Sequence, residues 1–454
     1  MAISAAIDAQ MPQQLISEAN ASDYANEIAM GAVLLMVAIA DGPYLLRRIR
    51  MAVGGEREHA RMDERAKTDC VANARALAPV ILAAAPRIEA NRELLPDLVA
   101  ALHEARLFRM LVPRSLGGEE LSPVEYVQAI EEIAKADAST AWCIAQTSVC
   151  STISSCLKPE TAAEIFKKNP RGILAWGPLG KNARAVAEKG GFRVTGTWPF
   201  ASGSRHATWL AAHSPVYEPD GQPRRDANGN PVEMTFVFPR ECATISDVWH
   251  VIGLKGTGSD TYALNDLFVT EDRAITALAR NPAERRERGA LYSFTVYQLF
   301  GSSFAAIALG IARSTLDAFV ALAQAKTPTG YTSLLRDNAV IQSQVGVAQS
   351  QLAAARVFFL HALEEIWQAA QSGTTSIDHR VRLRMASAHA SHQARQVVDT
   401  AYHAAGARAI FESNPFERRF RDAHAVSQQV QSHFSVFEAI GRYFLGLPPG
   451  TRLI

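Results

Sequence analysis

The sequence predicts an α+β fold that is mostly α-helical, with a helical domain, then an antiparallel β domain, then a helical bundle. Helical spacing of apolar residues continues from Ala66 to about Lys168, short alternating apolar runs occupy residues 173–275, and long helical stretches follow Leu291. With 454 residues, the chain is too long for one compact core. We therefore expect several packed domains.

Domain boundaries follow from these changes of pattern. We expect an N-terminal helical domain over residues 62–172, a middle β domain over residues 173–280 and a C-terminal helical bundle over residues 281–454. Residues 1–61 are interpreted as an N-terminal extension, because the regular helical pattern begins only after Met62.

The extension contains a continuous apolar run, Ile28–Ala40. A membrane-spanning helix needs about 20 apolar residues, and Asp41, Gly42 and Pro43 end this run too early. Asp23 precedes the run, where a signal peptide carries positive charge. A membrane span is therefore not favoured. An extra docked helix and an upstream segment outside the working protein are the two main interpretations, and a membrane anchor is the minority one.

Capping signals predict where helices begin in the N-terminal domain. Leucines recur at three- and four-residue spacing over Asn91–Leu102, which predicts an amphipathic helix there. A break rich in Pro and Gly follows at Leu111–Gly118. Ser122, Pro123 and Glu125 then supply the cap, first-turn and third-position residues typical of a new helix.

Short alternating runs predict the strands of the middle domain. They cover Phe192–Trp198, Met234–Phe238 and Ala263–Val269, and the turn signals Pro219–Gly221 and Asn228–Pro231 separate the first two. Short alternating runs separated by turn residues are typical of an antiparallel β domain. A dinucleotide-binding Rossmann domain is not expected, because the strands do not alternate with helices.

The C-terminal part has the pattern of a bundle of long helices. The run Phe300–Ala312 is rich in small residues, which lets helices approach each other closely. The pattern predicts further long helices over Val345–Ala370 and Leu383–Ala405. Asn414-Pro415 then breaks the helical pattern before the last helix.

Composition excludes several classes of function. The chain has 46 basic and 45 acidic side chains, so its formal charge of +1 offers no field for nucleic acid or a membrane surface. Its five cysteines form no C-x-x-C pair and no metal-ligand spacing. This usage is typical of reduced thiols in a cytoplasmic protein, and we expect no metal site.

Four motifs resemble the acyl-CoA dehydrogenase superfamily, in the family's order, over about residues 66–446. Gly253–Val269 resembles the strand that begins G-x-x-G-T/S-x-S, and Val112–Gly118 resembles the early P-x-x-x-G-G turn. Ala136–Ser139 resembles a D-x-S helix stretch, and Ala404–Ala423 resembles the terminal G-G-x-G and R-x-x-R-D segments. The resemblance implies an acyl-CoA dehydrogenase-like fold whose middle domain is an antiparallel β-barrel.

Two departures point to one branch of this superfamily. Dehydrogenases carry a glutamate base shortly after the R-D pair, but Ser427–His433 holds no carboxylate, and Ala175–Gly180 replaces the T-E-P loop. Gly196–Trp209 is similar instead to the W-x-F-x-S-G segment of two-component flavin monooxygenases. That resemblance implies an oxygenase component that takes reduced flavin (FMN or FAD) from a separate reductase and uses O2 to hydroxylate a small aromatic or similar substrate.

The W-x-F-x-S-G segment supplies the first candidate site residues. The resembling monooxygenases place a serine beside the flavin where this chain has Ser202, so Ser202 is a candidate catalytic and cofactor-binding residue. A hydroxyl that caps the strand end is the alternative. The resemblance makes Trp198, Phe200 and Gly203 candidate cofactor-binding residues, although aromatic residues at strand spacing also suit a plain core.

The same monooxygenases use two histidines that this chain lacks at the matching positions. One position holds Gln429, and the other falls among Thr147, Ser148 and Cys150. The nearest substitute is His424, which we take as the candidate catalytic base, with a structural histidine as the alternative.

The terminal motif supplies the remaining candidate cofactor-binding residues, Arg418, Arg421 and Gly406. The arginines suit flavin phosphate, and glycine lets the backbone approach a cofactor closely. The structural alternatives are an ion pair of the Arg421-Asp422 segment within the bundle and helix packing at Gly406. The arginine with which dehydrogenases clamp flavin from a neighbouring subunit has no counterpart in Ala325–Gly330, which predicts an exchangeable flavin.

The resemblance further implies a homotetramer or homodimer built through the C-terminal helices. Two other functions remain open. One is an acyl-CoA dehydrogenase whose base has moved to Glu364 or Glu365, and the other is a flavin-free scaffold. A carboxylate over the flavin ring would favour the dehydrogenase.

Deletion of residues 1–61 tests the interpretation of the extension. We expect the truncated protein to stay soluble and folded, because the motifs begin after Met62. Circular dichroism and a melting curve measure this. An insoluble product, or a much lower melting temperature than that of the full chain, would make the extension structural.

Overall fold

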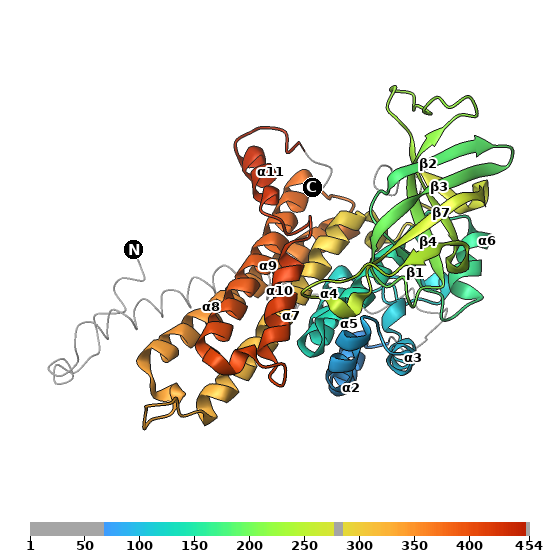
Figure 1. Cartoon of the computed structure of the whole chain (residues 1–454). Helices are drawn as coiled ribbons and strands as arrows, with labels where there is room; N and C mark the ends of the chain where they lie inside the picture. Colours follow the sequence, from blue (N-terminus) through green and yellow to red (C-terminus); the bar gives the residue numbers. More distant parts are fainter. Residues whose placement is uncertain (1–67, 277–284, 451–454) are drawn as a thin grey trace, which may run out of the picture. The chain divides into compact units, whose positions relative to one another are not determined.

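The computed structural model describes residues 68–276 and 285–450. The chain from Lys67 onward forms one compact unit, in which helices, a sheet and further helices follow one another as predicted (Figure 1). The predictions for residues 1–61, including the apolar run Ile28–Ala40, lie outside the described residues.

The first part of this unit is helical. Its α-helices are α2 (Cys70–Asn91), α3 (Pro96–Glu104), α4 (Pro123–Ala136), α5 (Ala138–Ser151) and α6 (Pro159–Ala162). The predicted capping box is present: the Ser122 hydroxyl accepts a bond from the Glu125 amide, and the Glu125 carboxylate accepts one from the Ser122 amide.

The predicted helix over Asn91–Leu102 is wrong in its bounds. Helix α2 ends at Asn91, and Arg92 has a left-handed φ of 57°. Helix α3 begins only at Pro96, because proline has no amide hydrogen to donate and fits the first helical turn instead of the interior. The leucine spacing continued across a helix boundary.

The middle part is one eight-stranded sheet. Its strands are β1 (Leu174–Trp176), β2 (Lys181–Glu188), β3 (Gly191–Ala201), β4 (Trp209–Tyr217), β5 (Glu233–Pro239), β6 (Thr244–Ser246), β7 (Asp260–Thr270) and β8 (Ala274–Thr276). The three predicted alternating runs lie in β3, β5 and β7. Strand order along the sheet is β6-β7-β3-β2-β4-β5-β8, with β1 paired to β4.

The prediction of an antiparallel barrel needs correction in two respects. In the described residues the end strands β6 and β8 do not pair with each other, so the sheet stays open. Each has only three residues, too few to build a closing ladder. The sheet is also mixed, because β1 and β2 both pair with β4 in parallel. The β2–β4 contact joins only Ala185 to Val216 and Val186 to Tyr217.

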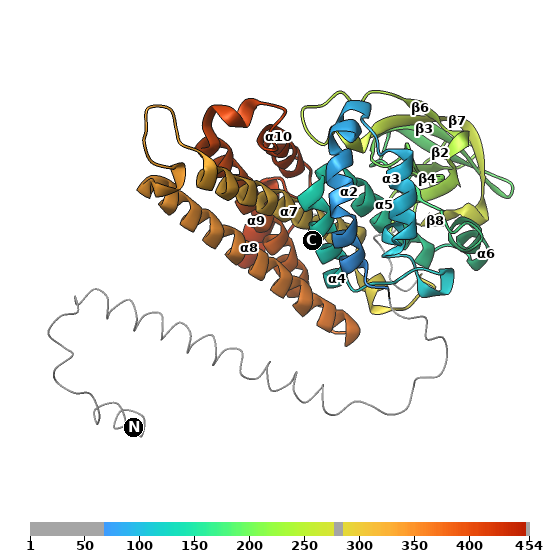
Figure 2. The ribbon, with the colours of Figure 1, turned by 90° about the horizontal axis from the view of Figure 1, so that it is seen from below.

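The last part is the predicted helical bundle. Its helices are α7 (Val296–Ala325), α8 (Ala339–Gln371), α9 (Ile377–Ala405), α10 (Phe416–Ser427) and α11 (Ser435–Phe444). Helix α7 packs against α8, α9 and α10 of the bundle and against α4 and α5 of the first part. Figure 2 shows α7 between α9 and these N-terminal helices. One helix thus joins the two helical parts.

Two described helices, α2 and α7, are long and apolar enough to cross a membrane by length and composition alone. Of the apolar window in α7, 61 % is buried inside the protein, as in the core helix of a folded domain. Only 22 % of the corresponding apolar window in α2 is buried, although α2 also packs against α4.

Small residues bring α7 close to α4. A methyl group added at Gly310 would lie 2.6 Å from the Glu131 carbonyl oxygen and 2.7 Å from the Ala134 Cβ. Both distances are shorter than a van der Waals contact, so any larger side chain must push the helices apart. The predicted close approach along Phe300–Ala312 is confirmed at this position.

We expect Gly310→Ala to destabilise the protein by about 1–3 kcal/mol, because overpacking at a helix crossing outweighs alanine's better helix propensity of about 1 kcal/mol. Gly346→Ala is the matched control. It lies inside α8 with no atom within 4 Å of an added methyl group, so it should be neutral or stabilising. Urea unfolding of both variants measures the difference. Equal effects would contradict the close packing.

Candidate active site

A cavity of about 1160 Å³ lies where the sheet meets both helical parts. Side chains from α5, α7, α10 and strands β1, β3, β4 and β5 line it, together with the loops at residues 249–259 and 428–431. Most of these side chains are apolar, and several are aromatic. The cavity is larger than the roughly 300–1,000 Å³ that accommodates one small ligand. It has room for two ring systems at once.

One wall of the cavity is a continuous series of rings. Trp142 stacks on Phe304 with ring centroids 4.0 Å apart and planes inclined by 3°. Phe304 stacks on Phe300 at 5.7 Å, and Trp176 meets Phe300 edge-on at 6.5 Å. His213 in turn lies edge-on to Trp176 at 5.2 Å. The rings hold each other in place and keep water from this side of the cavity.

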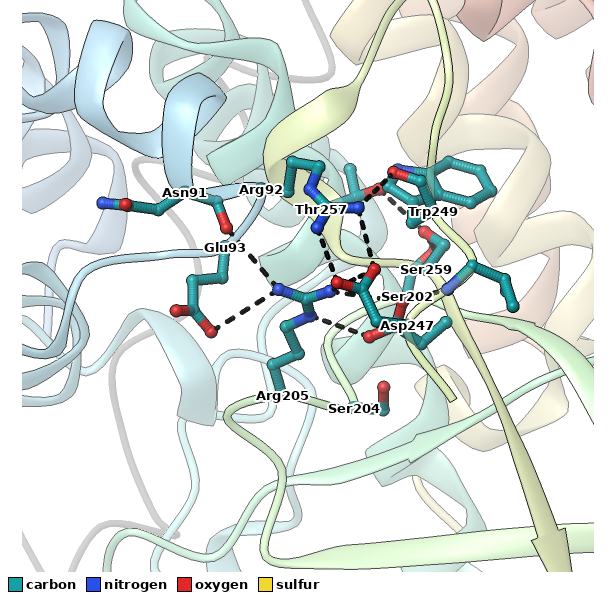
Figure 3. Close-up of polar contacts among 12 residues, drawn as sticks. Asn91, Arg92, Glu93, Ser202, Ser204, Arg205, Asp247, Trp249, Thr257 and Ser259 are labelled. Carbon is teal, nitrogen blue, oxygen red and sulfur yellow. Dashed lines mark hydrogen bonds and ion pairs between the residues drawn. The ribbon is translucent and has the colours of Figure 1, made fainter. Parts of the chain in front are cut away.

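A chain of hydroxyl groups begins at Trp142, at one end of this wall, and Figure 3 shows its members Ser202, Ser259 and Thr257. The Trp142 indole donates to the Ser202 hydroxyl at 3.0 Å. Ser202 and Ser259 are 2.6 Å apart, Ser259 and Thr257 are 2.7 Å apart, and Thr257 donates to the Leu254 carbonyl at 2.9 Å. Each hydroxyl has a single hydrogen, so these contacts allow one direction of donation, from Trp142 through to Leu254.

That direction determines what Ser202 can offer a ligand. Its own hydrogen is donated to Ser259, so in this arrangement its hydroxyl can only accept a further bond. Ser202 can donate to a bound ring if the chain reverses, with Ser259 donating to Ser202 and Thr257 turning from the Leu254 carbonyl to donate to Ser259. The buried hydroxyls Ser202 and Ser259 thus form a reversible hydrogen-bonding unit at the cavity wall.

An arginine network holds the turn that carries Ser202. Figure 3 shows Arg205 between the start of β7 and the loop after α2. Its guanidinium group pairs with Asp260 at 2.7 Å, Asp247 at 3.2 Å and Glu93 at 3.9 Å. Asp260 is only 2 % exposed, so the Arg205–Asp260 ion pair is a buried link between the turn and the start of β7.

The other candidates of the W-x-F-x-S-G segment have different positions. Phe200 is 59 % exposed and lines the cavity. Trp198 is fully buried, stacks on Tyr262 at 5.4 Å and does not line the cavity, which favours its interpretation as core. Gly203 has a left-handed φ of 80°, and a methyl group there would lie 2.9 Å from Thr147. Gly203 therefore shapes the turn without lining the cavity itself.

His424 lines the opposite side of the cavity, on α10. Its Nε2 lies 2.8 Å from a carboxylate oxygen of Asp399 on α9, and its ring packs on Phe420 at 4.4 Å. A carboxylate that holds one imidazole nitrogen fixes the orientation of the ring. Gln429, at the position of a monooxygenase histidine, also lines the cavity, but its amide donates to Ser432 at 2.6 Å.

Arg421 lines the cavity, yet its charge is already neutralised. It forms ion pairs with Glu89 of α2 and Glu417 of α10, both at 2.7 Å. The Glu417 contact is the ion pair inside the bundle that the structural alternative predicted for Arg421, and Asp422 accepts a bond from the Leu254 amide at 2.6 Å. Asp422 is buried, and burial raises its pKa to about 7.

Arg418 and Gly406 are not among the residues that line the cavity. Arg418 is one of the charges that act on the buried carboxyl group of Asp137. Gly406 follows α9 with a left-handed φ of 66°. The neighbouring Ala405 carbonyl accepts a bond from Lys326 at 2.9 Å. In the described chain, the cavity thus brings together Ser202, Phe200, Arg421 and His424 from the predicted set.

His213 is the main cavity residue that the sequence did not predict. It lies in β4, and its Nδ1 is 2.7 Å from the Thr235 hydroxyl on β5. Burial lowers the pKa of His213 to about 4, so the ring is neutral at physiological pH. A histidine directly after the apolar run Trp209–Ala212 was the available signal, because a polar ring in a mostly buried strand is unusual.

Comparison with known families defines the class of protein. Residues 68–168 match the family described as acyl-CoA dehydrogenase, N-terminal domain, and residues 302–434 match acyl-CoA dehydrogenase, C-terminal domain. The chain belongs to the acyl-CoA dehydrogenase superfamily, and the predicted membership is confirmed.

Two individual relatives show which branch of the superfamily this chain resembles. The chain is 29 % identical over 361 residues to an indole-3-acetate monooxygenase of Pseudomonas putida, covering 79 % of this chain and 89 % of the relative. It is 28 % identical over 388 residues to the oxygenase component of an FADH(2)-dependent resorcinol hydroxylase of a Rhizobium species, covering 82 % and 93 %.

The fold is also that of solved monooxygenases. The HsaA monooxygenase of M. tuberculosis superimposes with a TM-score of 0.78 at 24 % identity, covering 86 % of this chain and 100 % of that one. XiaF from a Streptomyces species, solved with FADH2 and glycerol, gives 0.77 at 24 % identity, covering 85 % and 97 %.

The low pKa of His213 predicts a pH dependence of stability. Between pH 6.5 and 4 the unfolded chain binds a proton at this ring that the folded chain does not bind, so the stabilisation present above pH 6.5 is lost as pH falls. His213→Gln should therefore lose less stability than the wild type between pH 7 and 4.5, by on the order of 2 kcal/mol, since one pKa unit is about 1.4 kcal/mol.

Urea unfolding at the two pH values measures this difference. His361→Gln is the control, because it makes the same substitution at a histidine whose side chain is 61 % exposed. If the two variants lose stability in parallel, His213 is not the buried neutral group described here.

Proposed function

We propose that this protein is the oxygenase component of a two-component flavin-dependent monooxygenase that hydroxylates a small aromatic substrate. The observation that carries the proposal is the combination, in one cavity, of a dry aromatic wall with the Ser202 hydroxyl chain at its end. The curated relatives named above are monooxygenases that act, by their names, on indole-3-acetate and resorcinol.

The cavity fits a flavin ring together with an aromatic substrate. Its volume exceeds that of a single-ligand site, and flat apolar rings suit stacking on Trp142, Phe300 and Phe304. Ser202 supplies the hydrogen-bonding group that a flavin edge requires. When bound, reduced flavin would supply the two electrons that activate O2, one atom of which enters the substrate while the other leaves as water. Neither FMN nor FAD is favoured by the residues described.

Ser202 and the aromatic wall have distinct tasks in this proposal. The wall excludes water and orients two stacked rings, while the hydroxyl chain presents either a lone pair or a hydrogen at one fixed point. Concerted rotation of the Ser202, Ser259 and Thr257 hydroxyls exchanges these two states. The site can therefore follow a change of protonation on its ligand.

Two histidines face the cavity, and their surroundings assign them different roles. A general base works best when its pKa is near the operating pH. His213, with a pKa of about 4, is too weak a base and serves as a neutral hydrogen-bonding partner for the substrate. His424 is held by the Asp399 carboxylate, so we assign it as the base that accepts the proton of a substrate hydroxyl or N–H group.

The dehydrogenase alternative has little support from the site. Neither Glu364 nor Glu365 lines the cavity, and Glu365 instead pairs with Arg382 at 3.2 Å. Among the described lining residues the one carboxylate is that of Glu233 on β5. Anaerobic mixing of the flavin-loaded protein with acyl-CoA thioesters tests this alternative, because a dehydrogenase would bleach the oxidised flavin.

Several finer points belong to the same proposal. A separate flavin reductase should supply the reduced cofactor, as in the relative that is named an oxygenase component. We propose a cytoplasmic protein that assembles as a homotetramer or homodimer through the C-terminal helices. Light scattering at micromolar concentration tests the assembly, and a monomer would contradict it.

The direct test of function supplies reduced FMN or FADH2, oxygen enriched in 18O and a panel of phenols and indoles. We expect one heavy oxygen atom in the product of at least one substrate, detected by mass spectrometry. Release of hydrogen peroxide with every aromatic compound and either flavin, without product, would contradict an oxygenase.

Ser202→Ala tests the role of the hydroxyl chain. A lost hydrogen bond to a buried partner costs about 1–3 kcal/mol, which corresponds to roughly tenfold or more in a rate. We expect reduced flavin to bind nearly as before, while the ratio of hydroxylated product to hydrogen peroxide falls about tenfold.

Ser151→Ala is the control for this substitution. Ser151 is equally buried, but its hydroxyl donates to the Thr147 carbonyl within α5, and it does not line the cavity. It should leave the ratio of product to peroxide unchanged. An unchanged ratio in Ser202→Ala would remove Ser202 from the mechanism.

A further inference from the structure

A buried arginine on α9 has no partner in the described chain. Arg384 is 4 % exposed, and its Nε, Nη1 and Nη2 atoms all lack a hydrogen-bond acceptor among the described residues. An uncompensated buried charge is among the most costly features a fold can contain. A folded protein that retains such a group normally supplies it with a counter-charge.

The surroundings of Arg384 offer donors in place of that counter-charge. A second, small cavity between α7 and α9 is lined by Arg384, Gln298, Ser387 and the more exposed Arg380. The Gln298 amide nitrogen and the Ser387 hydroxyl are also buried without a partner among the described residues. No carboxylate lines this cavity in the same part of the chain. Guanidinium, amide and hydroxyl groups therefore converge on one point with nothing to accept their hydrogens.

The backbone of α7 makes room for this arrangement. A methyl group at Gly301 would lie 3.2 Å from Nη1 of Arg384, so glycine lets the guanidinium group lie against the helix. Gln298 is held in position because its carbonyl oxygen accepts a bond from the Thr295 amide at 2.8 Å, which leaves its amide nitrogen to face the cavity.

We propose that Arg384, Gln298 and Ser387 form a binding site for a monatomic anion of halide size. The cavity volume of about 10 Å³ sets the size of the ligand, since about 10–15 Å³ holds a single water-sized particle. Phosphate and larger organic anions do not fit. Chloride is the physiological anion of this class.

Electrostatics favours an anion over a water molecule at this point. Burial lowers the pKa of Arg384 to about 10, and no neighbouring carboxylate contributes to that value, so the group is still charged at neutral pH. Water would accept hydrogen bonds but leave the charge uncompensated. A halide accepts the same bonds and neutralises the charge.

The site lies directly behind the wall of the large cavity. Tyr297 lines both cavities, and the added methyl group at Gly301 that would meet Arg384 would also lie 3.9 Å from Gln431, which lines the large one. Occupation of the anion site therefore supports α7 and the segment after α10 where they border the proposed active site.

Chloride binding is tested on the full-length protein at constant ionic strength, with sodium gluconate exchanged stepwise for sodium chloride or bromide. Because a ligand that binds only the folded state stabilises it by RT ln(1 + [L]/Kd), we expect the melting temperature to rise with the logarithm of the halide concentration once this exceeds the dissociation constant. A crystal grown in bromide should show an anomalous peak in contact with the Arg384 guanidinium group. Absence of both effects would show a water-filled site and overturn the proposal.

Arg384→Met removes the charge and keeps most of the side-chain length. We expect this variant to lose the rise of melting temperature with chloride while staying at least as stable as the wild type in gluconate. Arg382→Met on the same helix is the control, because Arg382 pairs with Glu365 and is 47 % exposed, and it should keep the response.

A chloride response that persists in Arg384→Met would overturn the assignment of the site. If that variant fails to fold, the bromide peak in the wild type decides alone. A carboxylate of a second copy seated on Arg384 in the crystal, with no bromide peak, would also overturn the proposal.

Discussion

The close packing of α7 is the constraint on which the rest of the structure depends. This helix is buried along much of its length because it packs against α4 and α5 on one side and α8, α9 and α10 on the other. Gly310 permits the approach to α4, and Gly301 leaves space for Arg384. The same helix contributes Phe300 and Phe304 to the cavity wall. A shift of α7 would therefore disturb the core, the proposed active site and the anion site together.

Local sequence signals predicted the elements better than their assembly. The capping box at Ser122 and the strands β3, β5 and β7 follow from neighbouring residues alone, because capping and alternation are local properties. The helix over Asn91–Leu102 was wrong because apolar spacing continues across the break before Pro96. The open edges of the sheet depend on which strands pair, and residue patterns within each strand do not specify that pairing.

In the candidate site, too, individual residues were predicted better than the contacts between them. Ser202 and His424 were predicted as site residues, and both line the cavity, but the sequence could not show that Ser259 and Asp399 are their partners. His213 was missed because one histidine in a strand carries no recognisable motif. Arg384 was missed because an arginine in a helix normally lies at the surface, and only the packing of α7 against α9 buries it.

The central claim is that the Ser202 hydroxyl chain and the aromatic wall hold a reduced flavin ring. A crystal structure of the protein with reduced FMN or FADH2, grown without oxygen, tests this most directly. The account predicts that the ring lies in the large cavity, against the series from Trp142 to Trp176, with the Ser202 hydroxyl about 2.7–3.2 Å from its edge. A flavin bound elsewhere, or a Ser202 hydroxyl that contacts only Ser259 while the ring is bound, would contradict the account.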